Sequence, residues 1–182
     1  MESTNRPLPI AALVHESAEH ADEFLYAFIQ DLQSQNKNIL GVIQAHPEVS
    51  YAYGSQMGIV DLSTGAYISI AQDLGKHNTS CCIDAEAISN SSRILQAARL
   101  QNPDLIIVNR FGKLEAEGTG FADEMLEIMS EGTPMLTVVA ERFLPMWREF
   151  TGGLATEILP DSAALHEWFK SISPQPTDET SS

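Results

Sequence analysis

Positive charge is scarce in this sequence. Lysine and arginine together number 10 against 25 aspartates and glutamates, which gives a formal charge of −15 over 182 residues. Because nucleic-acid binding relies largely on Lys and Arg side chains that neutralise phosphates, we expect no nucleic-acid partner. The same negative field disfavours an anionic membrane surface and leaves metal or basic partners open.

Long apolar segments are also missing. The amino-terminal segment MESTNRPLPIAALVHES has no cationic stretch followed by a long apolar run, so we predict no signal peptide. No window reaches the roughly 18 apolar residues typical of a membrane helix. We therefore expect a cytoplasmic protein without a membrane partner.

Cysteine is limited to Cys81 and Cys82, which are adjacent. Neighbouring cysteines have poor geometry for a mutual structural disulfide, and two cysteines do not make a disulfide framework. Reduced thiols are the expectation.

The loop after the first predicted strand lacks glycine and lysine. A phosphate-binding P-loop has the pattern GxxxxGK[ST] at this position, where backbone N–H groups and the lysine surround the phosphates. Here the chain reads His15-Glu16-Ser17-Ala18-Glu19-His20, and its two carboxylates would face the phosphates. Ordinary ATP binding is therefore not expected. His15 and His20 either contact a metal or an oxyanion, or belong to a solvated loop.

Hydrophobic residues make up 43% of the chain, enough for one sizeable core. Apolar runs predict buried strands, and stripes with helical spacing predict amphipathic helices. The predicted strands are 8–14, 39–45, 105–108, 134–140 and 154–159, and the predicted helices cover 18–32, 84–101, 121–131, 145–150 and 161–172. Ser17 is the expected N-cap of the first helix. Residues 57–62 and 66–70 flank Ser63-Thr64-Gly65 and predict a β-hairpin.

This order of elements is typical of a three-layer α/β fold with a mainly parallel sheet. The opening strand–helix–strand unit implies a parallel pair with a right-handed crossover, and the hairpin insert either extends a sheet edge or covers one face. We expect a single α/β domain over residues 1–172 and a disordered polar tail over 173–182.

Residues 104–121, DLIIVNRFGKLEAEGTGF, contain the densest group of polar and charged residues and glycines that could form a site. It runs from a buried strand directly into polar residues and glycines, and open α/β sheets bind ligands beyond the carboxyl ends of their strands. In one interpretation Arg110 and Lys113 bind an anion, with N–H donors from Gly118-Thr119-Gly120 and the next helix start. In the other, these cations pair with Glu115 and Glu117 and only fix the loop.

A second candidate is the corner Cys81-Cys82-Ile83-Asp84, with His77 four residues before it. A helix N-terminus favours thiolates, so reactivity or soft-metal binding is one interpretation, although the CxxC spacing of structural zinc sites is absent. Alternatively, one cysteine is a small buried residue and Asp84 is simply an N-cap.

The segment VNRFGKLEAEGTGF, with SCCIDAEA before it and TPMLTVVAERFLPMWREFTGGLATE after it, resembles the DUF2478 family of bacterial proteins. Members of that family are often encoded near molybdate-transport genes and are labelled molybdenum transporter ATP-binding proteins. The resemblance therefore implies a link to molybdenum metabolism. Cys81 and Asp84 match a Cys-x-Leu-Asp segment of the family, whereas Cys82 departs from a usually basic position.

More distantly, IIVNRFGKLE is similar to the Walker B region of the THEP1-type P-loop nucleoside triphosphatases. Their aspartate–glutamate pair falls on Asn109 and Arg110, so an amide and a cation replace a Mg²⁺ ligand and a water-orienting carboxylate. The resemblance implies a degenerate P-loop NTPase-like fold without the hydrolytic groups.

The leading hypothesis is a protein that binds a small anion without catalysis, molybdate or a related oxyanion or else a phosphorylated ligand. The predicted ligand-binding residues are Ser17, Asn109, Arg110, Gly112, Lys113, Glu115, Glu117, Gly118, Thr119 and Gly120. The candidate metal ligands are His15, His77, Cys81 and Cys82.

Two alternatives stay open. One is a metal-assisted hydrolase or nucleotide-processing enzyme with Glu115 or Glu117 as base. The other is a homo-oligomeric or partner-binding module that uses the hairpin together with Tyr51, Tyr53 and Tyr67.

Overall fold

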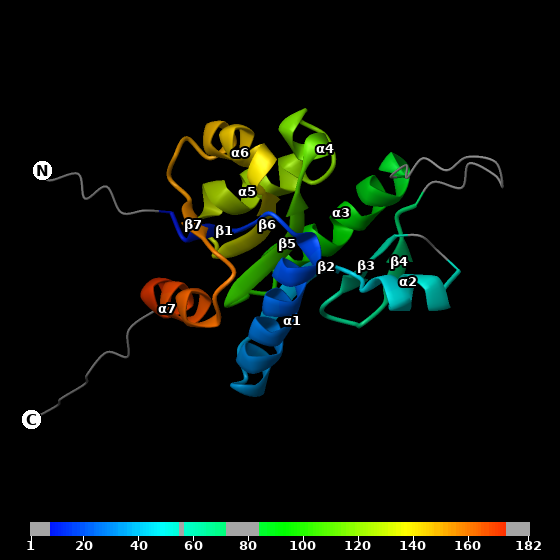
Figure 1. Ribbon diagram of the computed structural model, residues 1–182, viewed down its shortest axis with the longest axis horizontal. Coiled ribbons are helices and arrows are strands. Elements are labelled where there is room, and N and C mark those ends of the chain that lie inside the picture. Colours follow the sequence, from blue (N-terminus) through cyan, green and yellow to red (C-terminus); the bar gives the residue numbers. More distant parts are fainter. Residues whose placement is uncertain (1–7, 55–56, 72–83, 174–182) are drawn as a thin grey trace, which may run out of the picture.

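The computed structural model describes residues 8–54, 57–71 and 84–173 (Figure 1). The strands are β1 (Ile10–His15), β2 (Ile39–Gln44), β3 (Gly58–Asp61), β4 (Tyr67–Ser69), β5 (Leu105–Phe111), β6 (Met135–Ala140) and β7 (Thr156–Ile158). The helices are α1 (Ala18–Ser34), α2 (Pro47–Ala52), α3 (Ala85–Arg99), α4 (Lys113–Ala116), α5 (Ala122–Glu131), α6 (Leu144–Phe150) and α7 (Ser162–Ile172), with a 3₁₀ turn η1 (Glu141–Phe143).

The strands form one sheet in the order β4-β3-β2-β5-β6-β1-β7. The pairs β2–β5, β5–β6, β6–β1 and β1–β7 are parallel. The hairpin strand β3 pairs with β2 in antiparallel fashion, and β4 pairs with β3 in antiparallel fashion at the edge of the sheet. The predicted mainly parallel α/β sheet is thus confirmed, and the hairpin insert extends its edge. The hairpin turn includes Gly65 with φ +74°, as the turn prediction requires.

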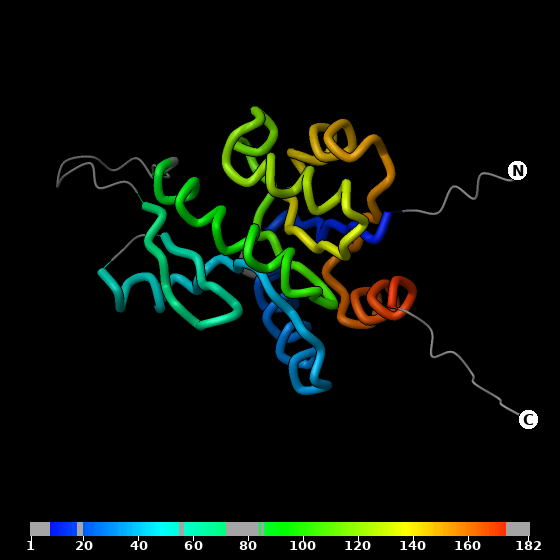
Figure 2. Tube along the Cα trace, turned by 180° about the vertical axis from the view of Figure 1, so that it is seen from behind, coloured from blue at the N-terminus to red at the C-terminus, as the bar shows by residue number. Residues whose placement is uncertain are grey.

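Helices cover both faces of the sheet (Figures 1 and 2). Helices α1 and α7 pack on one face with Leu25, Phe28 and Trp168. Helices α3, α5 and α6 pack on the other with Leu95, Met125 and Trp147. Because both faces are covered, the central strands are continuous apolar runs and not alternating ones, which explains why the sequence revealed them.

Strand β5 contains an irregularity that shapes its carboxyl end. Val108 pairs with Thr137 of β6 and Phe111 pairs with Val139, so β5 has one residue more than β6 between these pairs. The Thr137 hydroxyl donates to the Val108 carbonyl oxygen at 2.5 Å. A bulge of this kind re-aims side chains. Here it holds Asn109 and Arg110, which are joined by a cis peptide bond.

Several short elements were not predicted. Pro47 lies in the first turn of α2, where His46 accepts the Glu48 N–H through a ring nitrogen at 3.3 Å. Proline is well suited to the start of a helix because it has no N–H to leave unpaired. Helix α4 and the turn η1 were missed as well, and β5 continues three residues beyond the predicted end at Val108.

Two helix ends have the residue types that usually cap helices. The Asp84 carboxylate accepts the N–H groups of Glu86 and Ala87, and Gly132 ends α5 with φ +72°. Among the described residues, no helix is long and apolar enough to cross a membrane. The predicted tail falls, apart from its first residue, outside the described residues, as do His77, Cys81 and Cys82.

Candidate functional site

Three basic side chains gather at the carboxyl end of the sheet. His15 is the last residue of β1, Arg110 lies near the end of β5, and Arg142 lies in η1 directly after β6. The charges of both arginines act on His15, and the charge of Arg142 also acts on Arg110. We call His15, Arg110 and Arg142 the strand-end cluster. The strand order explains it, because β6 lies between β1 and β5.

His15 is buried without a hydrogen bond. Its exposed fraction is 6%, and neither ring nitrogen has a partner among the described residues. Burial lowers the pKa of His15, and the charges of Arg110 and Arg142 lower it further. The imidazole is therefore neutral at pH 7 and retains an unused N–H donor.

Arg110 contacts helix α1. Its Nη2 atom lies 3.4 Å from both carboxylate oxygens of Asp22, while its buried Nε atom has no partner among the residues described. Burial lowers the pKa of Arg110, whereas Asp22 raises it. A guanidinium stays charged through such shifts, so the cluster holds a partly desolvated positive charge.

Asp22 and Tyr26 lie one turn apart on α1 and connect it to two strand ends. The Asn109 side chain and the charge of Arg110 both lower the pKa of Asp22, and Arg110 also contacts this carboxylate directly. The Tyr26 hydroxyl donates to the Gln44 carbonyl oxygen of β2 at 2.6 Å. Burial raises the pKa of Asp22 despite these favourable neighbours. The Oδ1 atom of Asn109 is buried and unpartnered within the described structure.

A pocket of about 600 Å³ opens beside His15, and its walls include Glu16, Ser17, His20, Glu141 and Pro160. It lies at the N-terminus of α1, where unpaired N–H groups and the helix dipole favour negative charge. Ser17 is at the N-cap position, as predicted, but its side chain makes no capping hydrogen bond. Its exposed hydroxyl is therefore free to contact a ligand.

The loop after β5 is closed by its own hydrogen bonds. The buried Glu115 carboxylate accepts the N–H groups of Gly112 at 3.0 Å and Phe121 at 3.2 Å. The N–H groups of Gly118 and Thr119 donate to carbonyl oxygens of the same loop. Burial raises the pKa of Glu115, and the backbone hydrogen bonds lower it only in part. These donors hold the loop and are not directed at a ligand.

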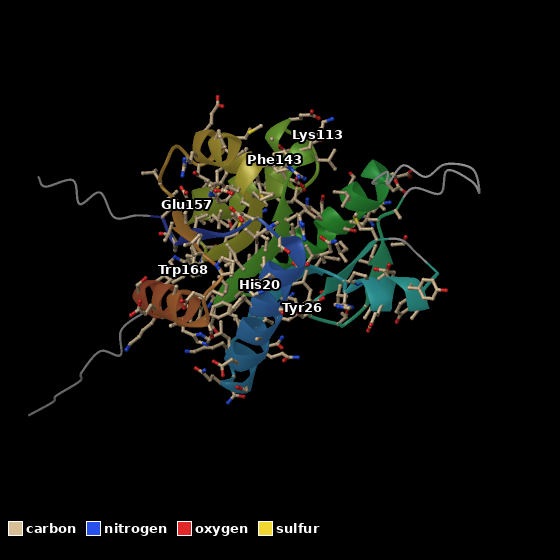
Figure 3. All side chains as sticks on the ribbon, viewed as in Figure 1. His20, Tyr26, Lys113, Phe143, Glu157 and Trp168 are labelled. Atoms are coloured by element: carbon tan, nitrogen blue, oxygen red, sulfur yellow. The ribbon has the colours of Figure 1, made fainter. Side chains whose placement is uncertain are left out.

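The predicted ligand-binding residues thus divide into two groups. Asn109 and Arg110 lie at the strand-end cluster, and Ser17 lies at the pocket beside it. Lys113 and Glu117 are exposed on and after α4, and Figure 3 shows Lys113 well away from His20 and Tyr26 on α1. The alternative ion-pair network also differs from expectation, because Arg110 pairs with Asp22 and not with either loop glutamate.

The metal hypothesis has no support in the described part of the chain. No group of three His, Cys, Asp or Glu side chains gathers there as metal ligands would. His15 borders the pocket without a second candidate ligand from the predicted set, since His77, Cys81 and Cys82 lie outside the described residues.

Sequence reasoning missed Asp22 and Arg142. Arg142 follows a buried strand in the same way as Arg110, so the strand-end rule would have found it. Asp22 gave no comparable signal, because an acidic residue beside an apolar helix stripe usually faces solvent.

Two comparisons with known proteins bear on the family. A family model described as "Protein of unknown function (DUF2478)" matches residues 10–168. The Molybdenum import ATP-binding protein ModC 2 of Bradyrhizobium diazoefficiens is 34% identical over 169 residues, which are 92% of this chain but only 19% of that protein. The mainly parallel sheet between two helical layers is consistent with a P-loop-like fold.

Proposed function

This chain belongs to the DUF2478 family, and we propose that it binds a small oxyanion at the strand-end cluster without transforming it. Molybdate is the first candidate ligand, because a relative of this chain is a molybdenum import ATP-binding protein. The observation that carries the proposal is the convergence at one end of the sheet of Arg110, Arg142 and a His15 ring that has no hydrogen-bond partner among the described residues.

The electrostatics favour a dianion. Arg110 and Arg142 repel each other because both are positively charged. Within the described part of the chain, no carboxylate lies at ion-pair distance from Arg142. A bound dianion would offset this repulsion and accept hydrogen bonds from the Nε atom of Arg110 and from the His15 ring. The chain has a net charge of −15, and these two arginines form a local region of positive charge within it.

Neighbouring groups add neutral donors. The free Ser17 hydroxyl and the N-terminus of α1 border the adjoining pocket, and helix N-termini bind phosphates and similar anions. The pocket has room for more than a tetrahedral oxyanion. A phosphorylated organic molecule is therefore the alternative ligand.

Binding fits this site better than catalysis. The loop at the start of α1 lacks the P-loop pattern, and Asn109 and Arg110 provide no carboxylate for Mg²⁺. Glu115, the proposed base of the enzymatic alternative, instead accepts two backbone N–H groups inside its loop.

Equilibrium dialysis against molybdate, tungstate, phosphate and MgATP tests the ligand class. We expect one molybdate or tungstate per chain and weaker retention of phosphate. Retention of none of the four, or of MgATP alone, would contradict the proposal.

A second candidate function is association through α2. Tyr51 is 85% exposed and Tyr53 is 66% exposed, and the Tyr53 ring stacks on Tyr67 of the edge strand β4 at 4.4 Å. Exposed aromatic side chains are typical of interface anchors. Sedimentation velocity would show self-association that a Tyr51→Ser/Tyr53→Ser variant loses, and a monomer at all concentrations would argue against it.

A further inference from the structure

Helix α1 supplies an internal anion to the strand-end cluster. Both carboxylate oxygens of Asp22 lie 3.4 Å from the Nη2 atom of Arg110. Charge-assisted hydrogen bonds of this kind are usually about 2.7–2.9 Å long, so the pair is loose. Among the described residues, the Nε atom of Arg110 is buried and has no partner. The ion pair therefore uses Nη2 alone and leaves the Nε atom of the same guanidinium edge unpaired.

Two other arginines provide a comparison within the same protein. Arg148 binds Glu157 through Nε at 2.9 Å and Nη2 at 2.6 Å. Arg99 contacts Glu131 through the same two nitrogens. Both pairs use the two-point geometry that suits a guanidinium and an oxyanion. Arg110 offers this geometry but does not use it with Asp22.

The surroundings make Asp22 a poor permanent partner. Its side chain is 22% exposed, and burial raises the pKa of Asp22 more than Arg110, the Asn109 side chain and His46 lower it. The carboxylate is therefore charged here at a net cost relative to water. An anion that binds Arg110 more completely would free Asp22 to turn toward solvent.

We propose that Asp22 is an internal competitor of the ligand, which holds Arg110 when no anion is bound and is displaced when an oxyanion takes the Nε–Nη2 edge. This inference rests on the proposed function of the cluster. Displacement lowers the affinity for every anion by the same factor, because each must replace the same carboxylate. It also breaks a contact between α1 and β5, so ligand binding loosens the start of α1.

Calorimetric titrations with molybdate and perrhenate test the competition. The two anions are both tetrahedral but differ by one charge, and the matched proteins are wild type, Asp22→Asn and Asp31→Asn. Asp31 lies on the same helix but contacts His166 of α7. We expect Asp22→Asn to bind both anions more tightly by the same factor, about tenfold, and Asp31→Asn to match wild type. Asp22→Ser provides a second variant in case Asp22→Asn alters folding.

Different outcomes of these titrations would contradict the role of Asp22 and the proposed function of the cluster. An affinity in Asp22→Asn and Asp22→Ser that equals or falls below that of wild type would overturn the role of Asp22 alone. A much larger gain for molybdate than for perrhenate would mean that Asp22 stays in place and merely repels charge, which also overturns displacement. Binding of neither anion by any of the proteins would overturn the proposed function together with this inference.

Discussion

His15 ends β1 and Arg110 lies one residue before the end of β5. The two strands are separated by β6, yet the charge of Arg110 lowers the pKa of His15. Neither residue reaches this position through local sequence, because β1 and β5 lie about 90 residues apart in the chain. The parallel sheet brings their carboxyl ends together. Under the proposed function, an anion bound beside this imidazole would raise the pKa of His15, so the titration of His15 would report binding.

The first prediction concerns the titration of His15. In an NMR titration we expect His15 to have a pKa below 6.5 because it is buried beside Arg110 and Arg142. His166 should titrate above 6.5, since its ring is hydrogen bonded to the Ser162 carbonyl oxygen and to Asp31. Molybdate should raise the pKa of His15 and leave that of His166 unchanged. A pKa of His15 that does not respond to molybdate would argue against an anion near this ring.

The second prediction concerns Arg142, which is exposed and which the sequence hypothesis did not include. Replacing it with alanine removes one charge near the anion without opening a cavity. We expect molybdate affinity to fall roughly fivefold, about 1 kcal/mol for a solvent-screened charge. The control is Arg148→Ala, because Arg148 is paired with Glu157 outside the cluster. Equal affinities for the two variants would exclude Arg142 from the site.

The third prediction concerns the loop after β5. Glu115→Ala leaves the N–H groups of Gly112 and Phe121 without their acceptor, and we expect a loss of about 2–4 kcal/mol in urea unfolding. Glu117→Ala, an exposed neighbour, should change stability by less than about 0.5 kcal/mol.

The difference in stability between wild type and Glu115→Ala should also depend on pH. The raised pKa of Glu115 means that the folded protein binds this proton more tightly than the unfolded chain does. Its contribution is therefore fully present below about pH 4.5 and is lost as the pH rises through the folded pKa. The stability difference between wild type and Glu115→Ala should shrink over that range, whereas a constant difference would contradict the assignment.

The fourth prediction concerns Gly41 in β2. Its φ is +113°, and an added Cβ would lie 2.0 Å from the Ile107 carbonyl oxygen of β5. Gly41→Ala should destabilise the fold by about 2–5 kcal/mol through strain and a backbone clash. Gly54→Ala is the matched control, with φ +70° but no described atom within 4 Å, and it should cost only about 1–2 kcal/mol. Similar losses would show that the clash is relieved.

The sequence predicts this fold well where the signal is local. Continuous apolar runs marked β1, β2, β5 and β6 because these strands are covered on both faces, and Ser63-Thr64-Gly65 marked the hairpin. The short helices α2 and α4 escaped because they contain too few residues for a periodic pattern.

The site is only partly predictable for a related reason. Asn109 and Arg110 were proposed as site residues from their place at a strand end, but the contact of Arg110 with Asp22 joins residues 88 positions apart. Which helix face meets which strand end depends on strand order, and no local pattern encodes that order. Lys113 was included because it is close in sequence to Arg110, and in the structure its side chain is exposed on α4.

The central claim is that Arg110 binds an oxyanion at the strand-end cluster. Isothermal titration of molybdate into wild type, Arg110→Ala and Arg148→Ala tests it most directly, with circular dichroism to verify that all three proteins are folded. The account predicts one site per chain in wild type, at least about tenfold weaker binding in Arg110→Ala, and unchanged binding in Arg148→Ala. Binding that is the same in all three proteins, or absent from wild type, would contradict it.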